Sequence, residues 1–90
     1  MFDFSFPGGD LIETGLRDLT EGRETTEALL VSIGAPRLRR IGLTVPETLP
    51  TPEIRLYQRL ADAESNSAHS RYNALIRRLV SFERAAECVK

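Results

Sequence analysis

The chain has 90 residues, of which 41% are hydrophobic and 28% charged, with a net charge of −1. This composition is typical of a small globular domain; it excludes a wholly disordered chain and disfavours a strongly basic nucleic-acid-binding protein. The longest uninterrupted apolar run, Ala28–Val31, is far shorter than the roughly 20 residues that span a membrane.

Cysteine content and charge distribution bear on compartment and association. The single cysteine, Cys88, cannot form an internal disulfide, and no basic segment precedes an apolar stretch at the N-terminus. We therefore expect a cytoplasmic protein with no membrane partner. Residues 1–35 carry seven acids against two arginines, whereas residues 67–90 carry five bases against two acids. An acidic front and a basic back suit internal pairing or head-to-tail association.

Residues 1–9 read as an extended arm. Phe2, Phe4 and Phe6 alternate with polar residues, the period of a strand with one apolar face, and Pro7-Gly8-Gly9 ends the pattern. The three rings either fold back to cap a small core or anchor the chain to a partner.

Residues 10–42 are expected to form short helices. Asp10 is a candidate N-cap for a helix over residues 11–21, in which Gly15 marks a close crossing and Gly22 ends the helix. Residues 27–33 and 36–41 are predicted as two further short helices separated by a turn at Gly34. The second of these helices carries arginines, and the pair superficially resembles a helix-turn-helix. Leu30 and Arg40 do not fit the residue pattern of that motif.

Residues 51–89 are predicted to form a helical hairpin. Thr51-Pro52-Glu53 is a typical helix start, and the helix that follows to about Glu64 is expected to bury Ile54, Tyr57, Leu60 and Ala61, with Leu56 flanking. After a polar break at residues 65–67, a long amphipathic helix runs from Ala68 to Val89. Its apolar stripe contains Tyr72, Leu75, Ile76, Leu79, Val80 and Phe82.

Glu83 departs from the pattern of this last helix because it points along the apolar stripe. A carboxylate there is costly unless it is paired or reaches water. We expect it to pair with an arginine from residues 37–40. Taken together, these segments predict an all-α fold: a single domain over residues 1–90, built as a compact bundle of four to five helices with a long C-terminal amphipathic helix and an extended N-terminal arm.

Few residues of this chain could support catalysis. The only histidine, His69, and the only cysteine, Cys88, lie nineteen residues apart in the last helix, which separates them by roughly 28 Å. No spacing of His, Cys and carboxylates indicates a metal site. We therefore expect a protein that is not an enzyme and has no catalytic, cofactor-binding or metal-binding residues.

The function predicted from the sequence is that of a small non-catalytic protein-interaction module, a homodimer or an accessory subunit of a larger complex. The expected interface residues are Phe2, Phe4, Phe6, Tyr72, Ile76, Leu79, Val80, Phe82 and Glu83. The alternative is a small nucleic-acid-associated regulator that uses arginine clusters on short helices. Its expected contacts are Arg37, Arg39, Arg40, Arg77 and Arg78.

Overall fold

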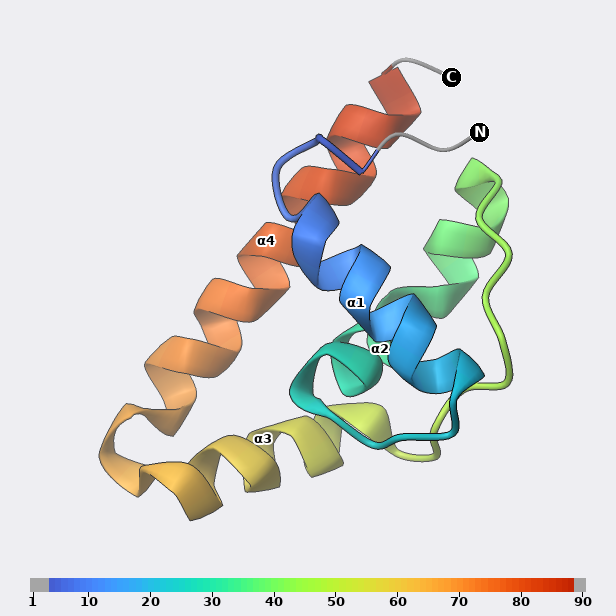
Figure 1. The fold of residues 1–90 in the computed structure, drawn as a ribbon. Coiled ribbons are helices and arrows are strands. Elements are labelled where there is room, and N and C mark those ends of the chain that lie inside the picture. Colours follow the sequence, from blue (N-terminus) through green and yellow to red (C-terminus); the bar gives the residue numbers. More distant parts are fainter. Residues whose placement is uncertain (1–3, 89–90) are drawn as a thin grey trace.

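The computed structural model describes residues 4–88, and over that range the chain is helical without strands (Figure 1). The elements are α1 (Gly9–Thr20), α2 (Thr26–Ile41), α3 (Pro52–Ala63), the short 3₁₀ helix η1 (Ser65–Ser67) and α4 (Ala68–Cys88). The predicted all-α bundle with a long C-terminal helix is confirmed. Phe2 and Val89, which the sequence places in the arm and in the last helix, lie outside the described residues.

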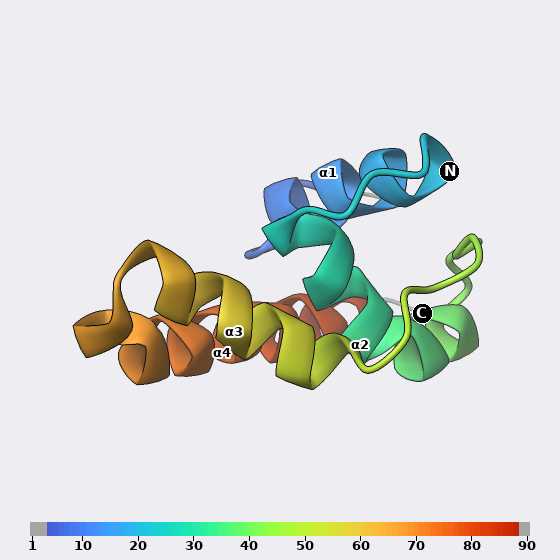
Figure 2. The ribbon, with the colours of Figure 1, turned by 90° about the horizontal axis from the view of Figure 1, so that it is seen from below.

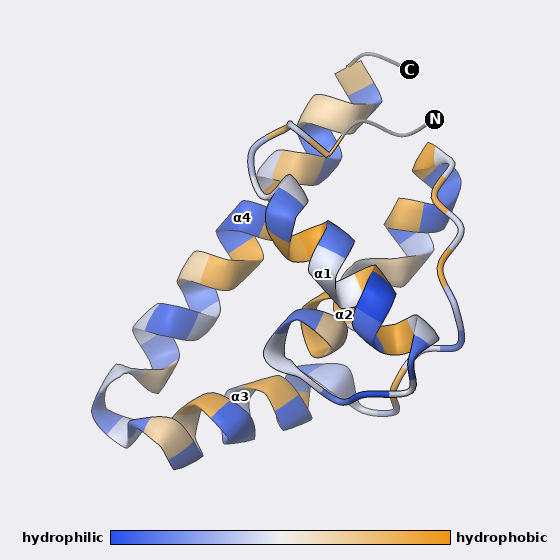
Figure 3. Ribbon diagram, in the orientation of Figure 1, coloured by the Kyte–Doolittle hydropathy of each residue, from blue (hydrophilic) through white to orange (hydrophobic). Residues whose placement is uncertain are grey.

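Helix α2 is the centre of the molecule. α1 packs on one side of it, and α3 and α4 lie on the other, as the view from below shows (Figure 2). Apolar and polar residues alternate around the helices (Figure 3), so that each can turn an apolar stripe toward the core. The largest fully buried side chains come from all four α-helices: Ile12, Leu29, Leu30, Val31, Leu38, Leu56 and Phe82.

The expectation of two short helices in residues 27–41 is wrong, because α2 runs through both Gly34 and Pro36. Gly34 is a packing residue here: a Cβ on it would lie 2.8 Å from a methyl carbon of Leu79 in α4. Pro36 costs the helix a backbone hydrogen bond, yet Ala35 before it and Leu38 and Ile41 after it are all buried. Burial of residues before and after Pro36 stabilises α2 as one continuous helix.

The N-terminus of α2 is fixed by a side-chain cap. The Ala28 amide donates to Oγ1 of Thr25, the N-cap of α2, and that hydroxyl donates to the buried Asp18 of α1 at 2.6 Å. Asp18 thus faces inward at the α1–α2 corner, although its charge suggests a solvent position. At the start of α1 the N-cap is Gly8, so the prediction of Asp10 as the cap is wrong.

Gly15 lies at a close helix crossing, as predicted. A Cβ there would overlap the carbonyl oxygen of Glu27 and a methyl group of Val31. The absence of a side chain lets α1 approach α2 closely.

The N-terminal arm forms turns and a bend over residues 4–8, and the predicted strand conformation is wrong for this segment. Phe4 stacks on Phe82 of α4 with ring centroids 6.2 Å apart, and Phe6 contacts the same ring at 6.2 Å. Gly8 has a positive φ of 81° that lets the chain turn into α1. The described part of the arm is therefore folded onto the core.

Candidate functional site

Helix α3 turns a different face to the core than its sequence pattern predicts. Leu56 and Leu60 are buried, whereas Ile54 is 66% exposed and Tyr57 is 41% exposed. The prediction that Ile54 and Tyr57 are buried is wrong. These two are the exposed large hydrophobic residues of the described chain, and their spacing places them on the same side of the helix.

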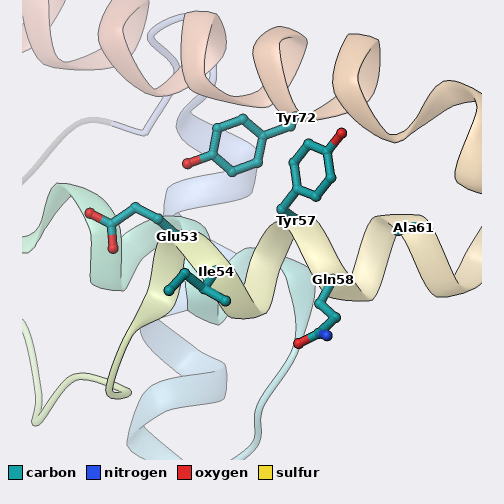
Figure 4. A pocket seen from close by; sticks show the side chains of 6 residues that line it. All are labelled: Glu53, Ile54, Tyr57, Gln58, Ala61 and Tyr72. Atoms are coloured by element: carbon teal, nitrogen blue, oxygen red, sulfur yellow. The ribbon is translucent and has the colours of Figure 1, made fainter.

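The exposed side of α3 borders an apolar hollow, which we call the aromatic hollow. Its volume is about 500 Å³. The rings of Tyr57 on α3 and Tyr72 on α4 meet there at 5.8 Å (Figure 4). The lining residues are Glu53, Ile54, Tyr57, Gln58, Ala61 and Tyr72.

Tyr72 brings a polar group to this apolar surface. Burial, and to a lesser extent the Glu53 carboxylate, raise the pKa of Tyr72 above its ordinary value of 10.0. The hydroxyl is protonated in neutral solution, as in any tyrosine, and can donate a hydrogen bond. In Figure 4 the Tyr72 ring hangs from α4 above the N-terminal turns of α3.

The apolar surface continues along α4 beyond the aromatic hollow. Ile76 and Val80 follow Tyr72 at intervals of four residues, and both are half-buried. They line a second hollow of about 300 Å³ between α2 and α4, together with Ile33 and Pro36 of α2. We call the surface formed by Ile54, Tyr57, Tyr72, Ile76 and Val80 the α3–α4 face.

Glu83 lies at the end of this second hollow and is 3% exposed. Its Oε1 is 3.5 Å from Nη1 of Arg37, so the predicted pairing with an arginine of residues 37–40 is present. Arg37 also donates through Nε to Glu87 at 2.8 Å, and this contact is the main reason that its pKa is raised. Burial raises the pKa of Glu83, since it outweighs the attraction of Arg37 and Arg40.

The other predicted interface residues divide into two groups. Phe4 and Phe6 pack on Phe82, and Phe82 and Leu79 are themselves buried in the core. Tyr72, Ile76 and Val80 remain partly exposed on the α3–α4 face. The sequence pattern missed Ile54 and Tyr57 as surface residues because their helical spacing is the same as that of a core stripe.

The arginines proposed for nucleic-acid contacts are largely engaged by the protein itself. Arg39 donates to the carbonyl oxygens of Val45 and Pro46, and Arg78 pairs with Asp10 at 3.1 Å. Arg37 and Arg40 line the hollow near Glu83, whereas Arg78 lines a different one with Thr26. Arg77 is exposed and forms no ion pair within residues 4–88.

The histidine and the cysteine, which could support catalysis, do not lie together in the described chain. His69 contacts Asn73 at 3.2 Å, and Cys88 is exposed at the last residue of α4. Residues 4–88 contain no group of three His, Cys, Asp or Glu side chains able to hold a metal ion. Over the same range, no helix combines the length and the apolar character needed to cross a membrane.

Comparison with known proteins gives no match: no protein family, curated protein or solved structure is significantly similar to this chain.

Proposed function

We propose that this chain is a small non-catalytic protein-interaction module and that the α3–α4 face is its contact surface. The observation that carries the proposal is the exposure of Ile54 and Tyr57 beside the half-buried Tyr72, over a hollow of about 500 Å³. Single exposed apolar residues are ordinary on protein surfaces, but contiguous apolar surface with an aromatic centre is typical of binding sites.

The choice of buried face in α3 supports this proposal. Leu56 and Leu60 are the fully buried residues of α3, and the half-buried Ala61 packs against the same core. Ile54 and Tyr57 are not part of this buried set, and apart from the contact of Tyr57 with Tyr72 they leave apolar surface exposed to solvent. A partner that covers them gives these side chains a role.

The arm and the arginines support other functions less well. The described phenylalanines of the arm are engaged with Phe82, and Arg37 and Arg78 have carboxylate partners that reduce the charge they offer to phosphates. We therefore favour a protein partner over nucleic acid.

The lone, exposed Cys88 suits a reducing compartment, and we propose the cytoplasm.

Site-specific photo-cross-linking in the native cell tests the proposal. A photoreactive amino acid replaces Gln58, which lines the aromatic hollow, or Arg17, which is exposed on α1. We expect a discrete adduct from position 58 that Ile54→Ser removes, and none from position 17. Because Ile54 is exposed, Ile54→Ser should leave the melting temperature nearly unchanged. A folded chain that gives no adduct from position 58 would overturn the proposal.

A further inference from the structure

The border of the α3–α4 face on α4 is positively charged. Arg77 lies three residues before Val80 and Arg84 four residues after it, so both arginines are neighbours of Val80 on the helix surface. Both are exposed. Neither forms an ion pair within the described chain, whereas Arg23, Arg37, Arg55 and Arg78 all pair with carboxylates.

The rest of the face does not neutralise these two arginines. Glu53 is the acid that lines the aromatic hollow, and it lies beside Tyr72 on the α3 side. Glu83 and Glu87, further along α4, are paired with Arg37. The solvent side of the face therefore keeps an excess of positive charge beside its apolar stripe.

The dimensions of the face suit one helix. Arg84 lies twelve residues after Tyr72 on α4, which separates them by roughly 18 Å at a rise of 1.5 Å per residue. This length matches three turns of a helix that presents apolar residues at positions i, i+3 or i+4, and i+7. The aromatic hollow at one end, with its volume of about 500 Å³ and its apolar lining, can accept a large apolar side chain of such a helix.

We propose that the α3–α4 face binds an amphipathic helix of another protein whose apolar side is bordered by acidic residues, and that Arg77 and Arg84 pair with those acids. This inference rests on the proposed function and adds the chemistry of the partner. A second copy of this chain is the poorer occupant. Symmetric contact between two copies repeats the same two arginines and supplies only Glu53 against them.

Two synthetic peptides of about 16 residues provide the probes, long enough for helix formation on binding. Both carry leucines at the same i, i+3, i+4 and i+7 positions; the flanking residues are Glu in one and Lys in the other. Binding to the full chain is followed by fluorescence anisotropy and by NMR shifts of Tyr57 and Tyr72. We expect the Glu peptide to bind at least about tenfold more tightly than the Lys peptide at low salt.

Charge-reversal variants test whether Arg77 and Arg84 themselves recognise the acidic peptide, or whether the peptide is drawn by the general charge of the helix. The double variant Arg77→Glu, Arg84→Glu should reverse the preference between the two peptides. Arg71 is exposed on the same helix and also has no carboxylate partner among residues 4–88, so Arg71→Glu should keep the wild-type preference. Tyr57→Ala should weaken binding of the Glu peptide without unfolding the protein.

Several outcomes would overturn the inference. Equal binding of the two peptides, or binding of neither at about millimolar concentration, would show that acidic borders are not recognised. A wild-type dimer that Ile54→Ser converts to a monomer would assign the face to a second copy. Shifts of Arg77 and Arg84 with a DNA duplex and not with the Glu peptide would assign the border to nucleic acid. The cross-link at position 58 would still test the proposed function separately.

Discussion

At the scale of single residues, Glu83 shows how packing and charge compete in a small core. It is almost fully buried, and its contact with Arg37 is long at 3.5 Å. Arg37 directs its shorter hydrogen bonds to Glu87 instead. The Oε2 atom of Glu83 lies over Gly34, where a Cβ would come within 3.1 Å of it. Glycine at this position therefore makes room for the carboxylate between α2 and α4.

The raised pKa of Glu83 predicts a dependence of stability on pH. The folded protein binds this proton more tightly than the unfolded chain does, so the free energy of unfolding falls as pH rises from the ordinary value of 4.5 through the folded pKa. Glu83→Gln removes this titration. We expect the stability of wild type relative to Glu83→Gln to fall with rising pH over this window. Urea denaturation at a series of pH values measures it.

The matched variant for this experiment is Glu47→Gln, which changes an exposed carboxylate on the connection between α2 and α3. A difference between wild type and Glu83→Gln that stays constant with pH would contradict the prediction. An increase with pH would mean that the ion pair with Arg37 outweighs burial.

At the scale of elements, the sequence predicted the existence of the helices better than their faces and interruptions. Gly15 and Gly22 act through close contact and local backbone geometry, and their roles as helix crossing and helix end were predictable. The turn predicted at Gly34 is wrong because, in the sequence alone, a glycine that ends a helix looks the same as a glycine that lets a neighbouring helix pack closely. Only the position of Leu79 distinguishes the two cases.

Helix α3 shows the same limit for the candidate site. Its sequence carries two apolar pairs, Ile54 with Tyr57 and Leu56 with Leu60, and each pair lies on one side of a helix. Periodicity alone cannot choose which of the two sides faces α2. The choice depends on tertiary packing, so the aromatic hollow was not predictable from the chain pattern, although Tyr72, Ile76 and Val80 were identified as surface candidates.

The close crossing of α1 and α2 at Gly15 predicts how a larger residue there affects stability. Gly15→Ala adds a methyl group where the Glu27 carbonyl and the Val31 side chain already lie, so the two helices must separate. We expect a loss of about 1–3 kcal/mol in the free energy of unfolding. Alanine's better helix propensity offsets it by about 1 kcal/mol at most. Arg17→Ala, exposed on the same helix, should change stability by less than about 0.5 kcal/mol.

At the scale of the whole molecule, the N-terminal arm connects the first helix to the last. Phe4 and Phe6 cover the Phe82 ring, and Asp10 at the start of α1 pairs with Arg78 in the middle of α4. Figure 1 shows the N-terminal segment beside the C-terminal half of α4. These contacts stabilise the packing of α1 against α4, which is otherwise limited.

Removing the two rings tests whether the arm belongs to the core. The double variant Phe4→Ala, Phe6→Ala should lower the free energy of unfolding by about 2–3 kcal/mol, less than for fully buried rings, because both are half-buried. Its mass by light scattering should equal that of the wild type. Unchanged stability with a loss of association would contradict this prediction and would make the arm an association device.

The hydroxyl of Ser32 has a consequence for local motion. It donates to the Ala28 carbonyl inside α2 and accepts from the amide of Leu49 at 3.1 Å, within the irregular connection that joins α2 to α3. The Leu49 amide is thus protected from deuterium exchange by a helix that it does not belong to. Its exchange would report separation of the connection from α2. The neighbouring amides of Glu47 and Thr48 have no such acceptor among residues 4–88 and do not register this opening event.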